Sequence, residues 1–294
     1  MDRRQFIRNG LLGAAAAVSA GSLRAQSGGG AGPVTAQDVH DYLMRLGPWV
    51  DPKDTVDTFK AGDPATVVKK MAVAWMSYTW ALRQAVEQGC NLFVCHEPTF
   101  YDHVDKDESV FAFEAARKKR ELVRESKLVI VRCHDVWDRV EKEGIPSAWA
   151  EFLGLTQLVR KDTFCHVYEV PSTTVRDFAR QVAAKVALLG QQAVELIGPE
   201  SKQIRTVAIG TGAITPFRQM ASKLKADLII ATDDGFCHWR DGALAVDMEY
   251  PVIVVHHGCS EESGMRKLAD HLTRVFPAVP VTFIPEKCMF KTIA

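Results

Sequence analysis

The chain has 294 residues, 36 of them acidic and 36 basic, so its formal net charge is zero. Hydrophobic residues make up 47% of it, which is enough to bury one or two ordinary cores. The neutral balance gives no electrostatic footprint for nucleic acid, and no apolar run approaches the ~20 residues of a bilayer span. Neither nucleic acid binding nor a membrane span is therefore expected.

The N-terminus resembles a twin-arginine export signal. Arg3 and Arg4 precede two bulky apolar residues and a further basic residue, and a modest apolar stretch follows over 11–20. A signal peptide of residues 1–25 would leave a flexible, glycine-rich linker over 26–34. Because this pathway exports proteins that have already folded, we expect a periplasmic or otherwise exported protein. The alternative is an amphipathic N-terminal helix.

The first half is expected to form an α/β lobe over residues 35–155. Val39, Leu43 and Leu46 share one face of a short helix that starts after residue 35, and an irregular stretch follows over 49–64. The other expected elements are strands over 71–75, 91–95 and 128–132 and helices over 80–88 and 110–124. Strands separated by such helical patterns indicate parallel βαβ units.

A second α/β lobe is expected over residues 156–294, with a boundary near 153–161 and a C-terminal part that can pack back on the first lobe. The expected strands are 165–170, 194–197, 206–209, 227–231, 252–255 and 281–284, and the expected helices are 174–188, 216–224 and 265–276. The predicted fold is therefore two α/β lobes with mixed or parallel sheets and a site at strand ends between them.

Histidine stands with carboxylate at the end of three expected strands. The six candidate ligands are His96, Glu97, His134, Asp138, His257 and Glu261. Ligands bind beyond the carboxyl ends of strands in open α/β sheets, and imidazole with carboxylate suits iron, manganese or zinc. Carboxylates in a first helical turn can also simply cap it, but three independent caps need not all include histidine.

The spacing of these residues is consistent with one or two metal ions. His134 and Asp138 are four residues apart, as are His257 and Glu261, so each pair would share a helix face if its strand turned directly into a helix. The adjacent pair at 96–97 can point to opposite sides and contact two ions.

The sequence resembles the dinuclear-metal proteins related to Ngg-interacting factor three, also called GTP cyclohydrolase I type 2-like, from about Gly62 to Glu286. The family's His-His-Pro element is represented by residues 96–98, its His-Thr-x-x-Asp by 134–138 and its Gly-His-x-x-x-Glu by 256–261. Glu97 thus replaces a histidine, which would favour a harder ion such as iron or manganese.

A weaker fourth element has Asp233 where the family has glycine, then Asp234, and His238 four residues after that acid. The resemblance implies two α/β domains around two divalent metal ions (iron, zinc or manganese) and a homo-oligomer, a hexameric ring.

The preferred functional interpretation is an exported dinuclear-metal protein that acts as a metal-dependent hydrolase on an unidentified small-molecule substrate. The ions would lower the pKa of a water, and His238 is the candidate proton shuttle. One alternative is a non-catalytic metal-binding or metal-chaperone protein. A second is a mononuclear zinc amidohydrolase in which Glu97 is the general base.

Overall fold

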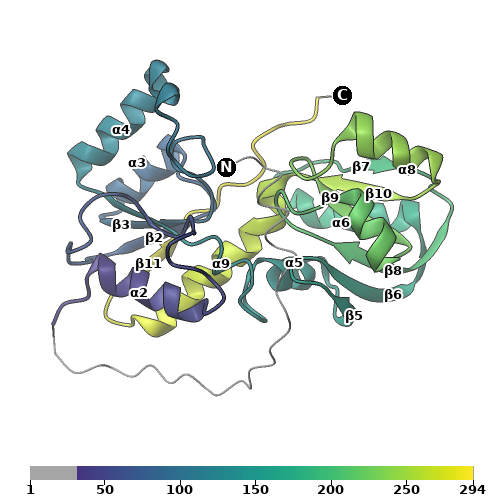
Figure 1. Ribbon diagram of the computed structural model, residues 1–294, viewed down its shortest axis with the longest axis horizontal. Helices are drawn as coiled ribbons and strands as arrows, with labels where there is room; N and C mark the ends of the chain where they lie inside the picture. The colour runs from purple at the N-terminus through teal and green to yellow at the C-terminus, as the bar shows by residue number, and fades with distance from the viewer. Residues whose placement is uncertain (1–31, 294) are drawn as a thin grey trace.

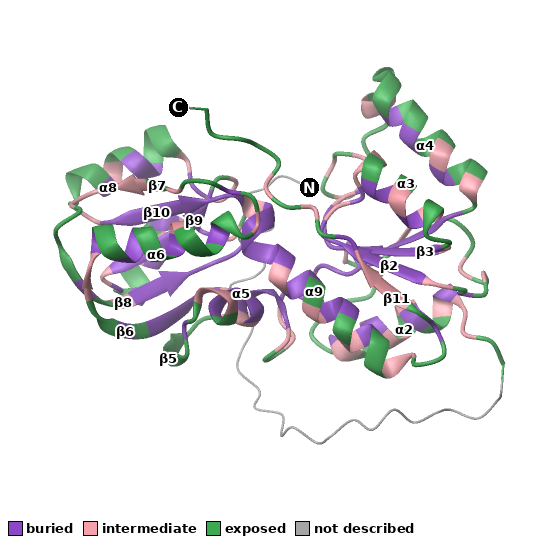
Figure 2. Cartoon of the chain, turned by 180° about the vertical axis from the view of Figure 1, so that it is seen from behind, coloured by how far each residue is buried: buried purple, intermediate pink, exposed green. Residues whose placement is uncertain are grey.

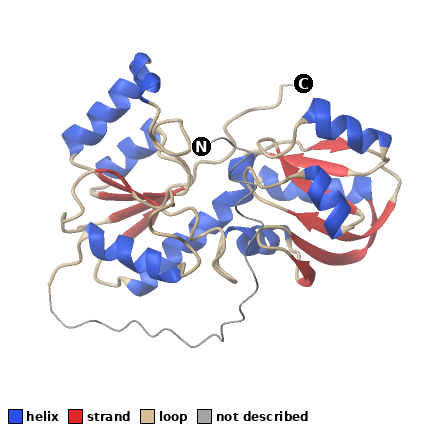
Figure 3. Cartoon of the chain, viewed as in Figure 1, coloured by secondary structure: helices blue, strands red, loops and turns tan. Residues whose placement is uncertain are grey.

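The structure is a computed structural model that describes residues 32–293. The predicted signal peptide and most of the predicted linker therefore lie outside the described residues. Two β-sheets, each with helices on both faces, make up the described chain (Figures 1 and 3). The expected α/β class is confirmed. None of the described helices is long and apolar enough to cross a bilayer.

The first sheet has the strand order β1-β4-β3-β2-β11. Its strands are β1 (Phe59–Ala61), β2 (Met71–Ala74), β3 (Leu92–Cys95), β4 (Val129–Arg132) and β11 (Val281–Phe283). Its helices are α2 (Ala36–Leu46), α3 (Thr79–Glu87), η1 (Glu108–Ala112) and α4 (Glu114–Ser126). Only the edge strand β1 is antiparallel to its neighbour, so the carboxyl ends of β2, β3 and β4 meet at one edge.

Every residue of β2, β3 and β4 is buried because helices cover both faces of this sheet (Figure 2). Met71 and Val73 lie in the core cluster that includes residues of α2, whereas Ala72 and Ala74 lie in the cluster that includes residues of α3. Successive strand residues therefore point to opposite helical layers.

The second sheet has the strand order β5-β6-β8-β9-β10-β7 and is mixed. Its strands are β5 (Gln157–Lys161), β6 (His166–Thr174), β7 (Glu195–Ile197), β8 (Gln203–Ile209), β9 (Leu228–Thr232) and β10 (Val252–Val255). The associated helices are α5 (Ile145–Leu153), α6 (Val175–Ala187), α7 (Phe217–Gln219), η2 (Met220–Leu224), η3 (His238–Gly242) and α8 (Ala243–Asp247). The pairs β8–β9 and β9–β10 are parallel, and the others are antiparallel.

A long helix, α9 (His257–Val275), begins where β10 ends and runs back to the first sheet (Figure 1). Met265, Leu268 and Leu272 of α9 pack in the core cluster that also holds residues of β2 and α2. The chain then adds β11 beside β2, and the C-terminal segment 285–293 crosses between the two halves. The chain after β10 thus returns to the first sheet.

Several elements differ from those expected. The helix expected over 110–124 is divided at Phe113, whose extended backbone separates η1 from α4. The helix expected over 265–276 begins earlier, at His257. Its first part was not predicted because Gly258 and Gly264 weaken the helical pattern. These glycines allow close contact with Trp75 and Ile145. Five elements were missed: β1 has only three residues, β5 is an exposed edge strand without alternation, α5 is too apolar to show a polar face, and η3 and α8 have only five residues each.

Candidate metal centre

The six predicted ligands converge where strands of both sheets end. His96 and Glu97 follow β3, His134 and Asp138 follow β4, and the pair at 257 and 261 lies in the first turns of α9, directly after β10. Five of these residues are buried, and the side chain of His257 is 15% exposed. The structure thus brings these six side chains together where β3, β4 and β10 end.

Two of the strand ends are held by backbone hydrogen bonds. After β3, the N–H groups of His96 and Glu97 both donate to the carbonyl oxygen of Trp75 (2.9 Å each). After β4, the Asp57 carboxylate accepts from the N–H groups of residues 134, 135 and 136 at 2.5–3.1 Å. No helix begins directly after β4: a turn follows, with a hydrogen bond from Asp138 N–H to His134 O (2.9 Å).

The donor atoms form three overlapping groups in which all atoms lie within 4.8 Å of one another. The groups are His96, Glu97 and His134; His96, Asp138 and Glu261; and Glu97, His257 and Glu261. His96 Nε2 lies 3.3 Å from Asp138 Oδ1 and 3.5 Å from Glu261 Oε2. Because the groups share members, one cluster offers more than one place for an ion.

All three imidazoles engage Nδ1 with an oxygen and present Nε2 to the cluster. His96 Nδ1 donates to the carbonyl of Cys133 (3.1 Å), and His134 Nδ1 lies 3.0 Å from Asp135 Oδ1. His257 Nδ1 lies 3.5 Å from Asp234 Oδ2, whereas its Nε2 lies 3.0 Å from Glu261 Oε2. Outer oxygens of this kind orient metal-binding histidines and set their tautomer.

One buried atom supports the fit of a cation directly. His96 Nε2 has no hydrogen-bond partner within the described residues, although two carboxylates face it. Leaving such an atom without a bond costs free energy, and a bound cation would satisfy it. The residues present therefore fit a divalent metal ion.

The electrostatics of the cluster lead to the same conclusion. Burial lowers the pKa of His96, but Glu261 and Asp138 outweigh it and raise that pKa to about 9. Burial likewise opposes the charged form of His257, yet Glu261 and the neighbouring acids raise its pKa well above the usual range. Protons on the two imidazoles thus offset the negative charge of the carboxylates, and a divalent cation would replace those protons.

Glu97 is held as an anion. Burial raises the pKa of this carboxyl, but the hydrogen bond and charge of His257, together with His134 and Arg132, hold it well below its usual range. Arg132 Nη2 lies 3.4 Å from Glu97 Oε2, and Arg132 Nε donates to the carbonyl of His96 (2.7 Å). The carboxylate of Glu97 is therefore paired with a buried guanidinium.

The glycine turn after β8 reaches the cluster. Gly212 has φ +52°, and a Cβ at this position would lie 2.3 Å from Glu261 Oε1 and 2.8 Å from His257 Nε2. Only glycine leaves room there for the ligand side chains.

Residues outside the predicted set complete the surroundings. Trp75 Nε1 donates to Glu261 Oε2 (2.8 Å), and Asp233 accepts from the N–H of His257 (2.8 Å). Trp75, Asp57 and Arg132 were missed because a single aromatic, acidic or basic residue has no spacing that marks it as part of a site.

His238 does not join the cluster. It opens η3 with an exposed side chain, and its Nε2 pairs with Glu195 Oε2 on β7 at 2.5 Å. Its contacts therefore give no support to the expected role as a proton shuttle.

Comparisons with known proteins agree with the fold. The sequence profile of the family Duf34/NIF3 (NGG1p interacting factor 3) matches residues 54–288. The hypothetical protein SA1388 of Staphylococcus aureus superposes with a TM-score of 0.74 at 18% identity, covering 89% of this chain and 100% of that chain. No curated protein sequence matches the chain.

Two further solved structures are similar. A Bacillus cereus protein related to NIF3 has a TM-score of 0.72 at 11% identity, covering 89% of this chain and 99% of its own. Reduced HcgD from Methanocaldococcus jannaschii has a TM-score of 0.68 at 16% identity, covering 86% of this chain and 98% of its own. At these identities the likeness supports the fold alone.

Proposed function

The chain belongs to the Duf34/NIF3 family, and we propose that it binds two divalent metal ions and hydrolyses a small-molecule substrate. The observation that carries this proposal is the sharing of Glu261 between two ligand groups, one with His96 and Asp138 and one with Glu97 and His257. A shared carboxylate can bridge two ions, which is the arrangement of many two-metal hydrolytic sites. Iron, zinc and manganese all suit this donor set.

The protein residues would have distinct tasks. When bound, the ions lower the pKa of a water and orient a substrate oxygen. Glu97 supplies an anionic oxygen that Arg132 holds in place, and Trp75 fixes the rotamer of Glu261 by its hydrogen bond. Asp234 faces Nδ1 of His257, so Nε2 of that ring stays directed at the cluster.

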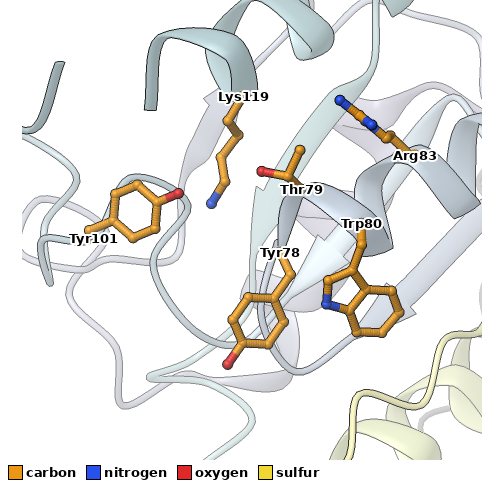
Figure 4. A pocket seen from close by; sticks show the side chains of 6 residues that line it. All are labelled: Tyr78, Thr79, Trp80, Arg83, Tyr101 and Lys119. Atoms are coloured by element: carbon orange, nitrogen blue, oxygen red, sulfur yellow. The ribbon is translucent and has the colours of Figure 1, made fainter. Parts of the chain in front are cut away.

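A cavity of ≈ 450 Å³ at the start of α3 offers a place for part of a substrate (Figure 4), because the ring of Tyr78 in its lining lies 6.3 Å from that of Trp75, which bonds Glu261. It is lined by Tyr78, Thr79, Trp80, Arg83, Tyr101 and Lys119. The stacked rings of Tyr78 and Trp80 lie 6.2 Å apart, and the Lys119 amine lies 4.3 Å from the centroid of the Tyr101 ring. Lys119 Nζ also donates to the carbonyl of Thr99, two residues after Glu97. Aromatic faces and cations together favour an anionic substrate that carries a ring.

The proposed site argues against Glu97 as a general base. A carboxylate whose pKa is held far below neutrality accepts protons weakly, whereas efficient bases have a pKa near the operating pH. A ligand role needs that same permanent negative charge. We therefore prefer two metal ions over a mononuclear zinc amidohydrolase.

The proposal also includes the location and assembly. The paired arginines at the N-terminus suggest twin-arginine export to the periplasm, and the family resemblance suggests a homohexamer. Mass measurement of the purified protein in solution tests the assembly.

The hydrolase proposal is tested with the mature chain loaded with iron, zinc or manganese. Nucleotides and aryl phosphoesters are the first substrates, because they combine an anion with a ring. We expect two ions per chain, metal-dependent turnover, loss of both turnover and metal in Asp138→Asn, and a raised KM in Arg83→Ala. Asp241→Asn is the matched control, because Asp241 is a buried carboxylate outside the ligand groups. Full metal loading without turnover on any substrate would instead favour a metal-binding or metal-chaperone role.

A further inference from the structure

A second group of potential ligands lies beside the candidate centre and shares no residue with it. A ring nitrogen of His256 and the Sγ atoms of Cys259 and Cys288 lie within 4.8 Å of one another. His256 precedes α9, Cys259 is in its first turn, and Cys288 belongs to the C-terminal segment after β11. All three are separate from the six residues described above.

The histidine of this group has an unsatisfied buried atom. His256 is 2% exposed, and its Nδ1 has no hydrogen-bond partner among the described residues. Its ring lies edge-on between Trp75 and Phe290, with centroids 5.8 and 5.5 Å away. A polar ring atom buried among aromatic groups costs free energy unless something binds it.

The two cysteines are free thiols brought together by the backbone. Cys259 is fully buried and Cys288 is half-buried, and neither forms a disulfide. The N–H of Cys288 donates to the carbonyl of Leu189 (2.8 Å), and the Sγ of Cys259 lies 3.9 Å from the same oxygen. The N–H of Lys287 donates to Glu262 Oε2 (2.6 Å). These bonds hold the C-terminal segment in place without a metal.

We propose that His256, Cys259 and Cys288 bind a thiophilic metal ion of the zinc class. Two thiolates and one imidazole are a donor set typical of zinc, whereas the neighbouring centre offers only nitrogen and oxygen. Three protein ligands leave a fourth tetrahedral position for water or another group.

Such an ion would tie the C-terminal segment to the start of α9. Cys288 would be joined to the first turns of α9, which carry His257 and Glu261. The ion at His256, Cys259 and Cys288 would therefore restrain two ligands of the neighbouring centre. This inference does not depend on hydrolysis, because it requires only metal binding.

The test uses Co²⁺ as the probe in the reduced, full mature chain. Thiolate ligation gives an intense sulfur-to-cobalt charge-transfer band in the near ultraviolet, which nitrogen and oxygen ligands do not give. We expect this band in the wild type and in Asp138→Asn, and its loss in Cys259→Ser with Cys288→Ser. Zinc analysis should show one ion fewer per chain in that double variant.

A second measurement keeps the test decisive if the double variant does not fold. Zn²⁺ should block alkylation of Cys288 in the wild type and leave Cys237, another half-buried thiol, unaffected. Absence of the cobalt band in reduced wild type, its persistence without both thiols, or equal alkylation of Cys288 with and without Zn²⁺ would each overturn the proposal.

Discussion

Substitution of Glu97 gives the sharpest test of the candidate centre. In Glu97→Ala the Arg132 guanidinium, which is fully buried and 3.4 Å from the carboxylate, loses its ion pair. Removing one partner of a buried pair costs about 3–5 kcal/mol. At roughly 2–4 °C per kcal/mol for a chain of this size, the metal-free thermal midpoint should fall by roughly 6–20 °C.

Metal binding should also change the thermal midpoint, by an amount that can be worked out. An ion at a hundred times its dissociation constant stabilises the fold by about 2.7 kcal/mol, so excess metal should raise the wild-type midpoint by roughly 5–11 °C. Glu97→Ala should lose most of this increase together with bound metal. Glu97→Gln keeps the shape and an acceptor for Arg132, so it should lose metal with a smaller cost to the fold. Glu97→His should retain metal with a preference for zinc.

Elemental analysis and calorimetry of the four proteins distinguish the roles of Glu97, with Asp241→Asn as the buried-carboxylate control. Full metal occupancy in Glu97→Gln together with lost turnover would assign Glu97 as a general base and refute the ligand role. Unchanged metal content in all variants would mean that the carboxylate only pairs with Arg132.

Three further predictions concern other parts of the chain. Gly212→Ala should weaken metal binding by about tenfold or more, about 1.4 kcal/mol, because its Cβ would lie 2.3 Å from Glu261 Oε1, whereas Gly154→Ala, also at positive φ but with open space around it, should leave metal affinity unchanged. The raised pKa of His96, about 9, means that the metal-free protein gains stability from this proton below about pH 6.5 and loses it as the pH rises towards 9. The thermal midpoint of the metal-free protein should therefore fall across that window, while the increase of the midpoint on metal addition grows. Titration calorimetry at pH 7 should detect proton release on metal uptake. A metal affinity that does not change with pH would contradict this. Finally, Arg3→Lys with Arg4→Lys should leave the precursor in the cytoplasm, as measured by cell fractionation and immunoblotting. Normal export of this double variant would refute the twin-arginine assignment.

The sequence predicted the strands that position the site because their apolar runs are short and fully buried. It also placed His96 and His134 at one edge, since parallel strands end together, whereas His257 reaches them from the end of β10 in the second sheet. It could not show that the β4 end is a turn rather than a helix, because Asp57, 77 residues earlier in the chain, fixes that turn by accepting backbone hydrogens.

The residues that contact the candidate ligands from outside the predicted set could not be found from the sequence for a similar reason. Trp75 and Arg132 act through contacts with Glu261 and Glu97 that depend on how strands pair, not on local spacing. His238 was expected near the cluster because the family resemblance implied a histidine four residues after Asp234, but the π-type turn of η3 directs it towards β7. Spacing predicts proximity only where the backbone between two residues is regular.

The course of α9 makes the second sheet an insertion in the topology of the first unit. The chain leaves the first unit through α5, builds β5 to β10, and re-enters it at His257. All six ligand side chains are thus carried by the ends of β3 and β4 and by a helix that packs on β2 and β11. The inserted sheet reaches the ligands through the turn at Gly212 and through Asp233 and Asp234. Under the proposed function, changes within the insertion would therefore reshape what lies over the cluster while the six side chains stay in place.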